Sequence, residues 1–368
     1  MKPVGRTLVS VIIIATVILI SAIAYKAGIF TFSLSTFSKG SVGGEFRFPK
    51  HRSNVFIPDE TAGHVHKTNT RLEITWTEHP EGSIFMSSNN LGFREDEDTP
   101  VSKPPDTYRI LVTGDSHIDG FINNSESFPN RLEILLNKKA SNQRYEVLNG
   151  ATSHYGPYNY LGFMKKYSYL EPDMFVVVLY TGNDFGEALQ TAELRGLIKT
   201  KERSEAYNEK LKSAASVNPG AVYQAVNQIY FFKTFPDMKE KALDVVESQL
   251  AEIQELCMER NIPFWLVCLP TKCDVEWEKD SDRLDEVRRI LNLSGSDLLI
   301  NQRVTEELTG RLDRYGVISL NVIDRMREPD EELYWKRDYH LNHRGHERLA
   351  EIFSEELIDY LNRSVSHR

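Results

Sequence analysis

The sequence predicts an α/β protein in three layers, with helices on both faces of a parallel sheet. From Tyr108 onward, short apolar runs alternate with longer segments whose apolar residues recur at helical spacing. This alternation is typical of a parallel sheet, because right-handed crossovers carry each helix back over the strands. A second observation is chemical: small polar clusters follow several apolar runs directly, where the strands are expected to end.

Five apolar runs are the expected strands of the sheet. Each is short and rich in branched or aromatic side chains, as a buried strand is. They are residues 110–112, 145–148, 175–179, 264–269 and 317–322, of which the third is fully apolar and expected to be central. Upstream, residues 71–77 alternate apolar and polar side chains, which predicts a half-buried strand paired with residues 84–86.

Apolar residues at helical spacing follow the third, fourth and fifth strands. Residues 243–257, 306–314 and 349–361 are expected helices. Residues 186–238 interrupt the alternation: a charged, helix-prone part is broken at Asn218-Pro219-Gly220, and an aromatic-rich part follows. We expect this insertion to lie beside the active edge, where it either shapes a substrate cleft or is a solvated helical excursion.

Composition excludes some partners and limits the role of cysteine. The 368 residues carry a formal net charge of −9 and no long basic run, which argues against a nucleic-acid-binding protein. Cys257, Cys268 and Cys273 are too few for a disulfide framework and are expected to be buried thiols, although a Cys268–Cys273 bridge stays open. We expect no cofactor.

Residues 8–24 are almost all apolar and follow two basic residues, Lys2 and Arg6. The stretch is long enough to cross a bilayer, and its basic flank favours a cytoplasmic amino terminus. We expect an uncleaved anchor, with a signal peptide cut after Ala24 as the alternative. The expected organisation is an anchor or signal (1–28), a tether with a small β-rich lead-in (29–107) and a main domain (108–368) across the membrane.

The first expected strand ends at Gly114 and runs directly into Asp115-Ser116-His117, before a helix. In open α/β sheets, ligands bind at the carboxyl ends of the strands. Ser116 is therefore expected to face a substrate with its own backbone N–H directed into the same space. The simpler alternative is that Asp115 and Ser116 only cap the helix.

Three further polar segments are expected at the same edge: residues 149–157, 180–184 and 338–346. Acyl transfer through serine needs a nucleophile, a base, a group that orients the base, and donors for the oxyanion. Ser116 supplies the nucleophile, His340 the base and Asp338 its partner. The expected oxyanion donors are the N–H of Ser116, a backbone N–H near His154, and the side-chain amide of Asn183.

These four segments resemble the sequence blocks of the SGNH, or GDSL, hydrolase superfamily, from about residue 90 onward. The lead-in N-L-G-F-R at residues 90–94 resembles membrane-tethered or exported bacterial members, and H-L-N-x-x-G-H at residues 340–346 resembles the closing block. The resemblance implies a flavodoxin-like α/β/α sandwich, with Ser116 as nucleophile, His340 as base, Asp338 as its partner and Asn183 as oxyanion donor.

The chain departs from the family pattern at two positions. His154 stands where the second block usually has glycine, so a side chain is expected beside the pocket while the backbone N–H is kept. The last block is D-x-H, from Asp338 to His340, instead of the usual D-x-x-H.

Three histidines, His340, His343 and His346, also allow an alternative interpretation as a metal site beside Asp338. We expect no metal, because the last two histidines are more simply explained as the start of a helix. Arg94 and Tyr155 are candidate substrate contacts, with a structural role as the alternative.

The sequence therefore predicts a serine esterase anchored in a bacterial inner membrane, with its catalytic domain facing the periplasm or exterior, or secreted after cleavage. Its expected substrate is an O-acyl group of an envelope or exported glycan, or a lipid ester. One alternative is an O-acyltransferase that uses the same triad to acylate a polysaccharide. Another is an inactive glycan-binding or assembly protein.

Overall fold

A computed structural model of the chain describes residues 55–139, 143–328 and 330–366. Residues from Phe56 onward form one compact unit, which contains every feature described below. The apolar segment 8–24 lies outside the described residues, so its role as an anchor or signal stays a prediction. Within the ranges given above, no helix combines the length and the apolar character that crossing a membrane requires.

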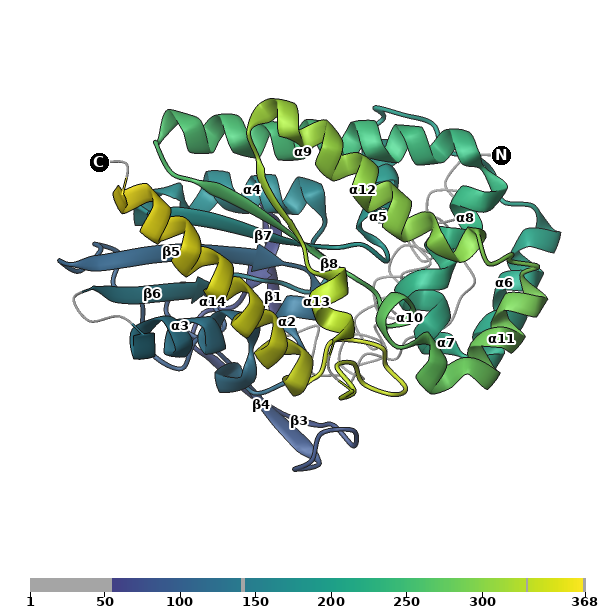
Figure 1. The fold of residues 1–368 in the computed structure, drawn as a ribbon, viewed down its shortest axis with the longest axis horizontal. Helices are drawn as coiled ribbons and strands as arrows, with labels where there is room; N and C mark the ends of the chain where they lie inside the picture. The colour runs from purple at the N-terminus through teal and green to yellow at the C-terminus, as the bar shows by residue number, and fades with distance from the viewer. Residues whose placement is uncertain (1–54, 140–142, 329, 367–368) are drawn as a thin grey trace, which may run out of the picture. The chain divides into compact units, whose positions relative to one another are not determined.

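The unit is built around a sheet of five parallel strands (Figure 1). Their order across the sheet is β6-β5-β7-β8-β9, which is the strand order of flavodoxin-like folds. The strands are β5 (Thr107–Gly114), β6 (Arg144–Asn149), β7 (Met174–Tyr180), β8 (Phe264–Leu269) and β9 (Ile318–Asn321). The five predicted strands and the central place of the third are confirmed.

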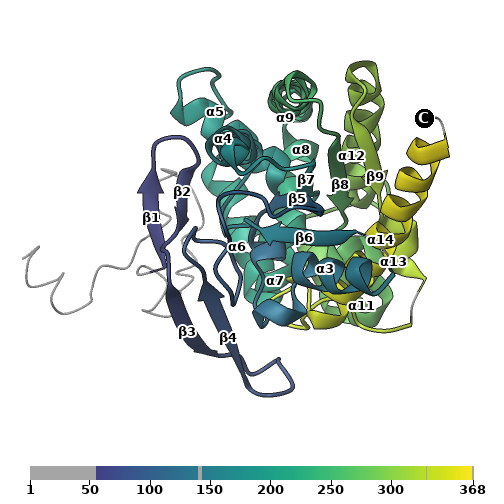
Figure 2. The ribbon, with the colours of Figure 1, turned by 90° about the vertical axis from the view of Figure 1, so that its left-hand side faces the viewer.

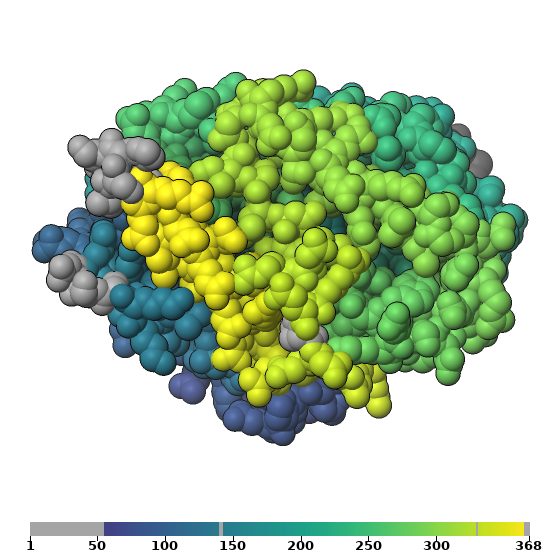
Figure 3. Space-filling view, in the orientation of Figure 1, coloured from purple at the N-terminus to yellow at the C-terminus, as the bar shows by residue number. Residues whose placement is uncertain are grey.

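Helices cover both faces of the sheet and complete the predicted three layers (Figure 2). On one face, Leu132 of α3 (Phe128–Lys139) and Phe353 of α14 (His343–Ser366) share an apolar cluster with Val112 and Val176 of the strands. Figure 3 shows α14, in yellow, at the surface. The other face is covered by α4 (Pro157–Tyr167), α5 (Asp184–Leu194), α9 (Pro236–Glu259) and α12 (Ile300–Leu312).

Two antiparallel hairpins precede the sheet in the chain. The predicted one pairs β3 (Thr70–Thr75) with β4 (Ser83–Ser88), and its apolar side packs on Phe121. The other pairs β1 (Phe56–Asp59) with β2 (Gly63–His66). The sequence did not predict this hairpin because each strand has only four residues and no clear apolar alternation.

The insertion at residues 186–238 is helical. After the end of α5 it contains α6 (Glu205–Val217), α7 (Pro219–Ala221), the π-helical turn η5 (Val222–Val226) and α8 (Asn227–Thr234). The predicted break at Asn218 is confirmed, because its side chain accepts a hydrogen bond from the Ala221 N–H and begins α7. Further short helices are α2 (Ser116–Asp119), α10 (Lys272–Val275), α11 (Ser281–Ile290) and α13 (Ile323–Arg327).

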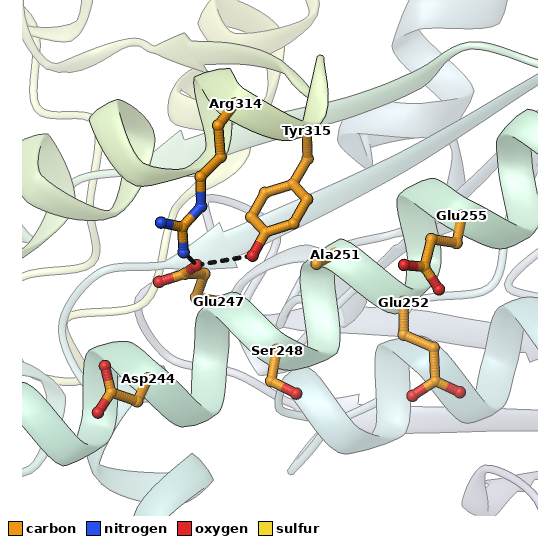
Figure 4. Close-up of a pocket in the computed structure, with 8 residues that line it drawn as sticks. All are labelled: Asp244, Glu247, Ser248, Ala251, Glu252, Glu255, Arg314 and Tyr315. Atoms are coloured by element: carbon orange, nitrogen blue, oxygen red, sulfur yellow. Dashed lines mark hydrogen bonds and ion pairs between the residues drawn. The ribbon is translucent and has the colours of Figure 1, made fainter.

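A surface pocket of about 570 Å³ lies between α9 and the turn η8 (Asp313–Tyr315), as Figure 4 shows. Several carboxylates line it, but Glu247 already accepts hydrogen bonds from Arg314 and Tyr315. None of its lining residues belongs to the four segments singled out in the sequence. The three cysteines are buried free thiols, so a Cys268–Cys273 bridge is not formed.

Candidate active site

The turn from β5 into α2 places Ser116 at the carboxyl edge of the sheet. Asp115 caps α2: its side chain accepts a hydrogen bond of 2.9 Å from the His117 N–H. The turn is tight enough that a Cβ on Gly114 would lie 2.8 Å from the Ile118 side chain. Glycine is therefore favoured two residues before the serine. Ser116 itself is half-buried at the start of α2.

Ser116, His340 and Asp338 form one connected chain of hydrogen bonds. The Nε2 of His340 lies 2.8 Å from the Oγ of Ser116, and its Nδ1 lies 2.5 Å from a carboxylate oxygen of Asp338. Since a carboxylate only accepts, Nδ1 carries a proton, and Nε2 is then free to accept the serine proton. The histidine and aspartate side chains are only 6% and 7% exposed. The three residues predicted as a triad are thus in contact.

The imidazole of His340 is held between aromatic rings. His117 stacks on it at 4.5 Å between ring centroids, and Phe121 meets it edge-on at 5.3 Å. The Nδ1 of His117 accepts from the Leu341 N–H, so its Nε2–H donates to Gln224. Burial, together with the neighbouring His340, lowers the pKa of His117 well below its usual value. His117 is therefore a neutral support for the catalytic ring.

The loop after β6 contains His154, the first of the two departures from the SGNH pattern. Its backbone has φ of +68°, and its side chain is exposed. The neighbouring N–H groups already donate to protein acceptors: Ser153 to Asp119 (2.9 Å), Tyr155 to Thr152 (3.2 Å) and Gly156 to Asn159 (3.1 Å). That a backbone N–H near His154 helps to form the oxyanion hole stays a prediction.

Asn183, the third predicted oxyanion donor, directly precedes α5. Its Nδ2 donates to Oε1 of Glu187 at 3.1 Å, which fixes the amide and leaves its second hydrogen for another acceptor. Burial, reinforced by the nearby Asp115, raises the pKa of Glu187 to about 8. The carboxyl group that holds Asn183 is thus largely neutral at pH 7.

Two more buried acids lie behind the site. Burial raises the pKa of Asp115 to about 7 and raises that of Asp184 well above its usual value. Asp184 accepts from the Tyr180 N–H and the Tyr160 hydroxyl, each at 2.9 Å. It thereby fixes the end of β7 beside Asn183. The sequence showed Asp184 only as the residue after Asn183.

Arg94 and Tyr155, the two candidate substrate contacts, are both buried and bonded within the protein, which favours a structural role for each. Arg94 is 1% exposed and donates to Asn124, to Ile122 and to Asp119. Tyr155 is fully buried, and its hydroxyl donates to the His64 carbonyl at 2.6 Å.

The geometry of the three histidines does not support the metal alternative. His340 uses both ring nitrogens within the triad, and the Nδ1 of His346 accepts from the Phe128 N–H at 3.0 Å. His343 begins α14. Across residues 55–366 without the gaps at 140–142 and 329, no cluster of three or more His, Cys, Asp or Glu side chains is arranged to hold a metal ion.

Asp119 is a residue that the sequence did not single out. Its buried carboxylate accepts from Arg94 (2.9 Å), from His66 of β2 (3.0 Å) and from both the N–H and the hydroxyl of Ser153. His64 of β2 also donates to the Ser153 carbonyl at 2.8 Å. The helix that begins with Ser116 and the first hairpin thus jointly hold the loop that carries His154.

Comparison with known proteins was informative only for solved structures. No family model and no curated relative matches the sequence. Among solved structures, the chain is similar to TesA, with 12% identity, coverage of 66% of this chain and 94% of that one, and a TM-score of 0.37. It is also similar to the acetyl xylan esterase AlAXEase (12% identity, 66% and 96% coverage, TM-score 0.39). A third is a catalytic mutant of Axe2, an acetylxylan esterase from Geobacillus stearothermophilus. It has 13% identity, covers 68% of this chain and 93% of its own, and gives a TM-score of 0.40.

The order of the four segments and the contact among Ser116, His340 and Asp338 agree with the resemblance found in the sequence. The chain is similar to the SGNH hydrolases. Ser116, the loop that carries His154, and Asn183 follow β5, β6 and β7 at one edge of the sheet. At the two positions where the sequence departs from the SGNH pattern, His154 and Tyr339, which lies between Asp338 and His340, have positive φ.

Proposed function

We propose that this protein is a serine hydrolase of ester bonds. The observation that carries the proposal is the unbroken chain from the Ser116 hydroxyl through His340 to Asp338. A serine hydroxyl is a weak nucleophile, and a neutral imidazole at 2.8 Å can take its proton as the attack proceeds. The carboxylate at Nδ1 fixes the tautomer that this role requires and stabilises the imidazolium that forms.

In the first half of the reaction, Ser116 Oγ attacks the ester carbonyl carbon and its proton moves to Nε2 of His340. The carbonyl oxygen becomes an oxyanion, for which the N–H groups of Ser116 and His154 and the amide of Asn183 are the donors. The C–O bond to the alcohol then breaks, and the departing oxygen takes the proton from Nε2. An acyl group stays on Ser116.

In the second half, water attacks the acyl carbon while His340 takes one of its protons. The bond to Ser116 Oγ breaks, the proton returns from Nε2 to Oγ, and the carboxylic acid is released. No reductant or oxidant is needed, because ester hydrolysis changes no oxidation state. Every proton that leaves Ser116 or water passes through His340. The same chain of residues serves both halves.

We place the substrate among O-acyl groups of an exported or envelope glycan, or lipid esters. This proposal rests on the apolar segment at residues 8–24, which is expected to anchor the chain in the inner membrane and leave the main domain in the periplasm. Transfer to a sugar hydroxyl in place of water would use the same residues.

A fluorophosphonate probe tests the proposal directly, because it labels a serine only when a base activates it. The full chain should be labelled at Ser116 and should hydrolyse p-nitrophenyl acetate, whereas Ser116→Ala should do neither. Absence of labelling, or equal labelling of the variant, would refute an enzymatic role and favour a glycan-binding or assembly protein. Incubation with an acetylated donor and an oligosaccharide acceptor separates the two reactions: free acetate shows hydrolysis, and acetylated acceptor shows transfer.

A further inference from the structure

The residue between the two acid–base partners has an unusual backbone. Tyr339 has φ of +68°, a left-handed conformation that is rare for an aromatic residue. Asp338 and His340 stand on either side of this left-handed residue, and their side chains meet at 2.5 Å. The loop also closes on itself, because the Trp335 N–H donates to the His340 carbonyl at 2.9 Å.

The side chain of Tyr339 is fixed from two other parts of the chain. Its hydroxyl donates to Asp280 at 2.5 Å and accepts from the Nδ2 of Asn218 at 2.7 Å. Tyr339 and Asn218 are both fully buried. Asn218 is itself immobilised, because its Oδ1 accepts from the Ala221 N–H at the start of α7. Through Tyr339, the insertion therefore contacts the loop that carries Asp338 and His340.

The backbone of the insertion also supports this loop directly. A Cβ on Gly220 would lie 2.2 Å from the Arg337 carbonyl and 2.5 Å from the Tyr339 ring, so α7 packs on the loop as closely as a glycine allows. On another side, the Nζ of Lys272 lies 5.2 Å from the centroid of the same ring, within the range of a cation–π contact. The turn at Tyr339 is thus enclosed by the insertion and by α10.

We propose that Tyr339 is a positioning residue and that the insertion at residues 186–238 supports the acid–base loop through Asn218 and Gly220. The left-handed turn allows a D-x-H spacing to make the contact that a D-x-x-H spacing makes elsewhere. A left-handed conformation is unfavourable for a tyrosine. The hydrogen bonds of the buried Tyr339 hydroxyl and the close packing of Gly220 stabilise it. This inference rests on the proposed function of the triad.

The test compares Tyr339→Phe, which removes only the hydroxyl, with Tyr207→Phe. Tyr207 is a matched control, since it is a buried tyrosine of the same insertion whose hydroxyl has no hydrogen-bond partner in the described part of the chain. With p-nitrophenyl acetate, and with active sites counted by fluorophosphonate labelling, Tyr339→Phe should lower kcat about tenfold with KM little changed, as expected for a lost buried hydrogen bond. Tyr207→Phe should match the wild type.

The pH profile separates positioning from loss of folded protein. A carboxylate beside an imidazole favours its protonated form, so a loosened contact between Asp338 and His340 should move the acid limb of kcat/KM to lower pH. Tyr339→Phe should show this shift, and Gly220→Ala should show it too because the added Cβ displaces the loop. Fewer active sites with an unmoved acid limb would mean a merely structural role and would overturn the proposal.

The two proposals fail in different ways. Wild-type kinetics and an unchanged acid limb in both variants, with normal labelling of Ser116, would refute the positioning role and leave the esterase intact. A wild type that is neither labelled nor active would refute the esterase, and the positioning role with it.

Discussion

The side-chain amide of Asn183 donates a 3.1 Å hydrogen bond to the carboxyl group of Glu187. A carboxylate at this place would repel an oxyanion that forms beside the same amide. Burial opposes that charge, because it raises the pKa of Glu187 to about 8. The acid that orients the oxyanion donor is thus uncharged under the conditions in which the donor is expected to act.

We therefore expect activity to fall as the pH rises through about 8. Glu187 is protonated below its raised pKa and ionises above it, because burial and the nearby Asp115 both disfavour its charged form. Glu187→Gln keeps a neutral acceptor for Asn183 and should remove this alkaline decline. The measurement is kcat against pH from 6 to 10. A wild-type profile that stays flat, or an alkaline limb that persists in the variant, contradicts the prediction.

Asp338→Asn should lower kcat by about 10² to 10⁴ while the fold is kept. An asparagine amide can donate to Nδ1 of His340, which favours the tautomer with its proton on Nε2 and leaves no acceptor for the serine proton. Steady-state kinetics measure the loss, and thermal unfolding checks the fold. Because Asp338 contacts only the far side of the imidazole, KM should change little. Retention of wild-type kcat would exclude Asp338 as the orienting group.

Asp119→Asn should lower the free energy of unfolding by about 3–5 kcal/mol, since it leaves the buried Arg94 without its partner charge. Burial alone would raise the pKa of Asp119, but His66 and Arg94 hold it far below its usual value. The stabilisation is therefore present above the unfolded-state pKa near 4 and is lost only in strong acid. Urea unfolding at pH 7 measures the change, and a loss below about 1 kcal/mol would show that the network is redundant.

His154→Gly should keep activity, because the backbone N–H is retained, and should relieve a left-handed conformation that costs a residue with a Cβ about 1–2 kcal/mol. His154→Val is the matched opposite, since a β-branched residue fits φ of +68° poorly. In thermal unfolding, His154→Gly should have a higher Tm than His154→Val. A marked loss of kcat in the glycine variant would instead assign a role to the exposed imidazole itself.

The sequence predicted the sheet because apolar runs located the five strands. Polar clusters at the carboxyl ends of those strands also predicted that Ser116 and His340 lie at one edge, where their side chains are in contact. The burial of Arg94 and its three partners could not be predicted, because they are tertiary properties. The roles of Asp119 and Tyr339 had no sequence signal, since one depends on a distant loop and the other on a backbone angle.

The contacts of His64 and His66 show that the part of the chain that supports the candidate site begins before the main sheet. Both belong to β2, yet they hold Ser153 and Asp119, which flank the catalytic groups. A fragment starting at Tyr108 would contain all four SGNH-like segments and would still lack the hairpin that holds the loop of His154. Domain boundaries drawn from these motifs alone would therefore separate the candidate active site from its own support.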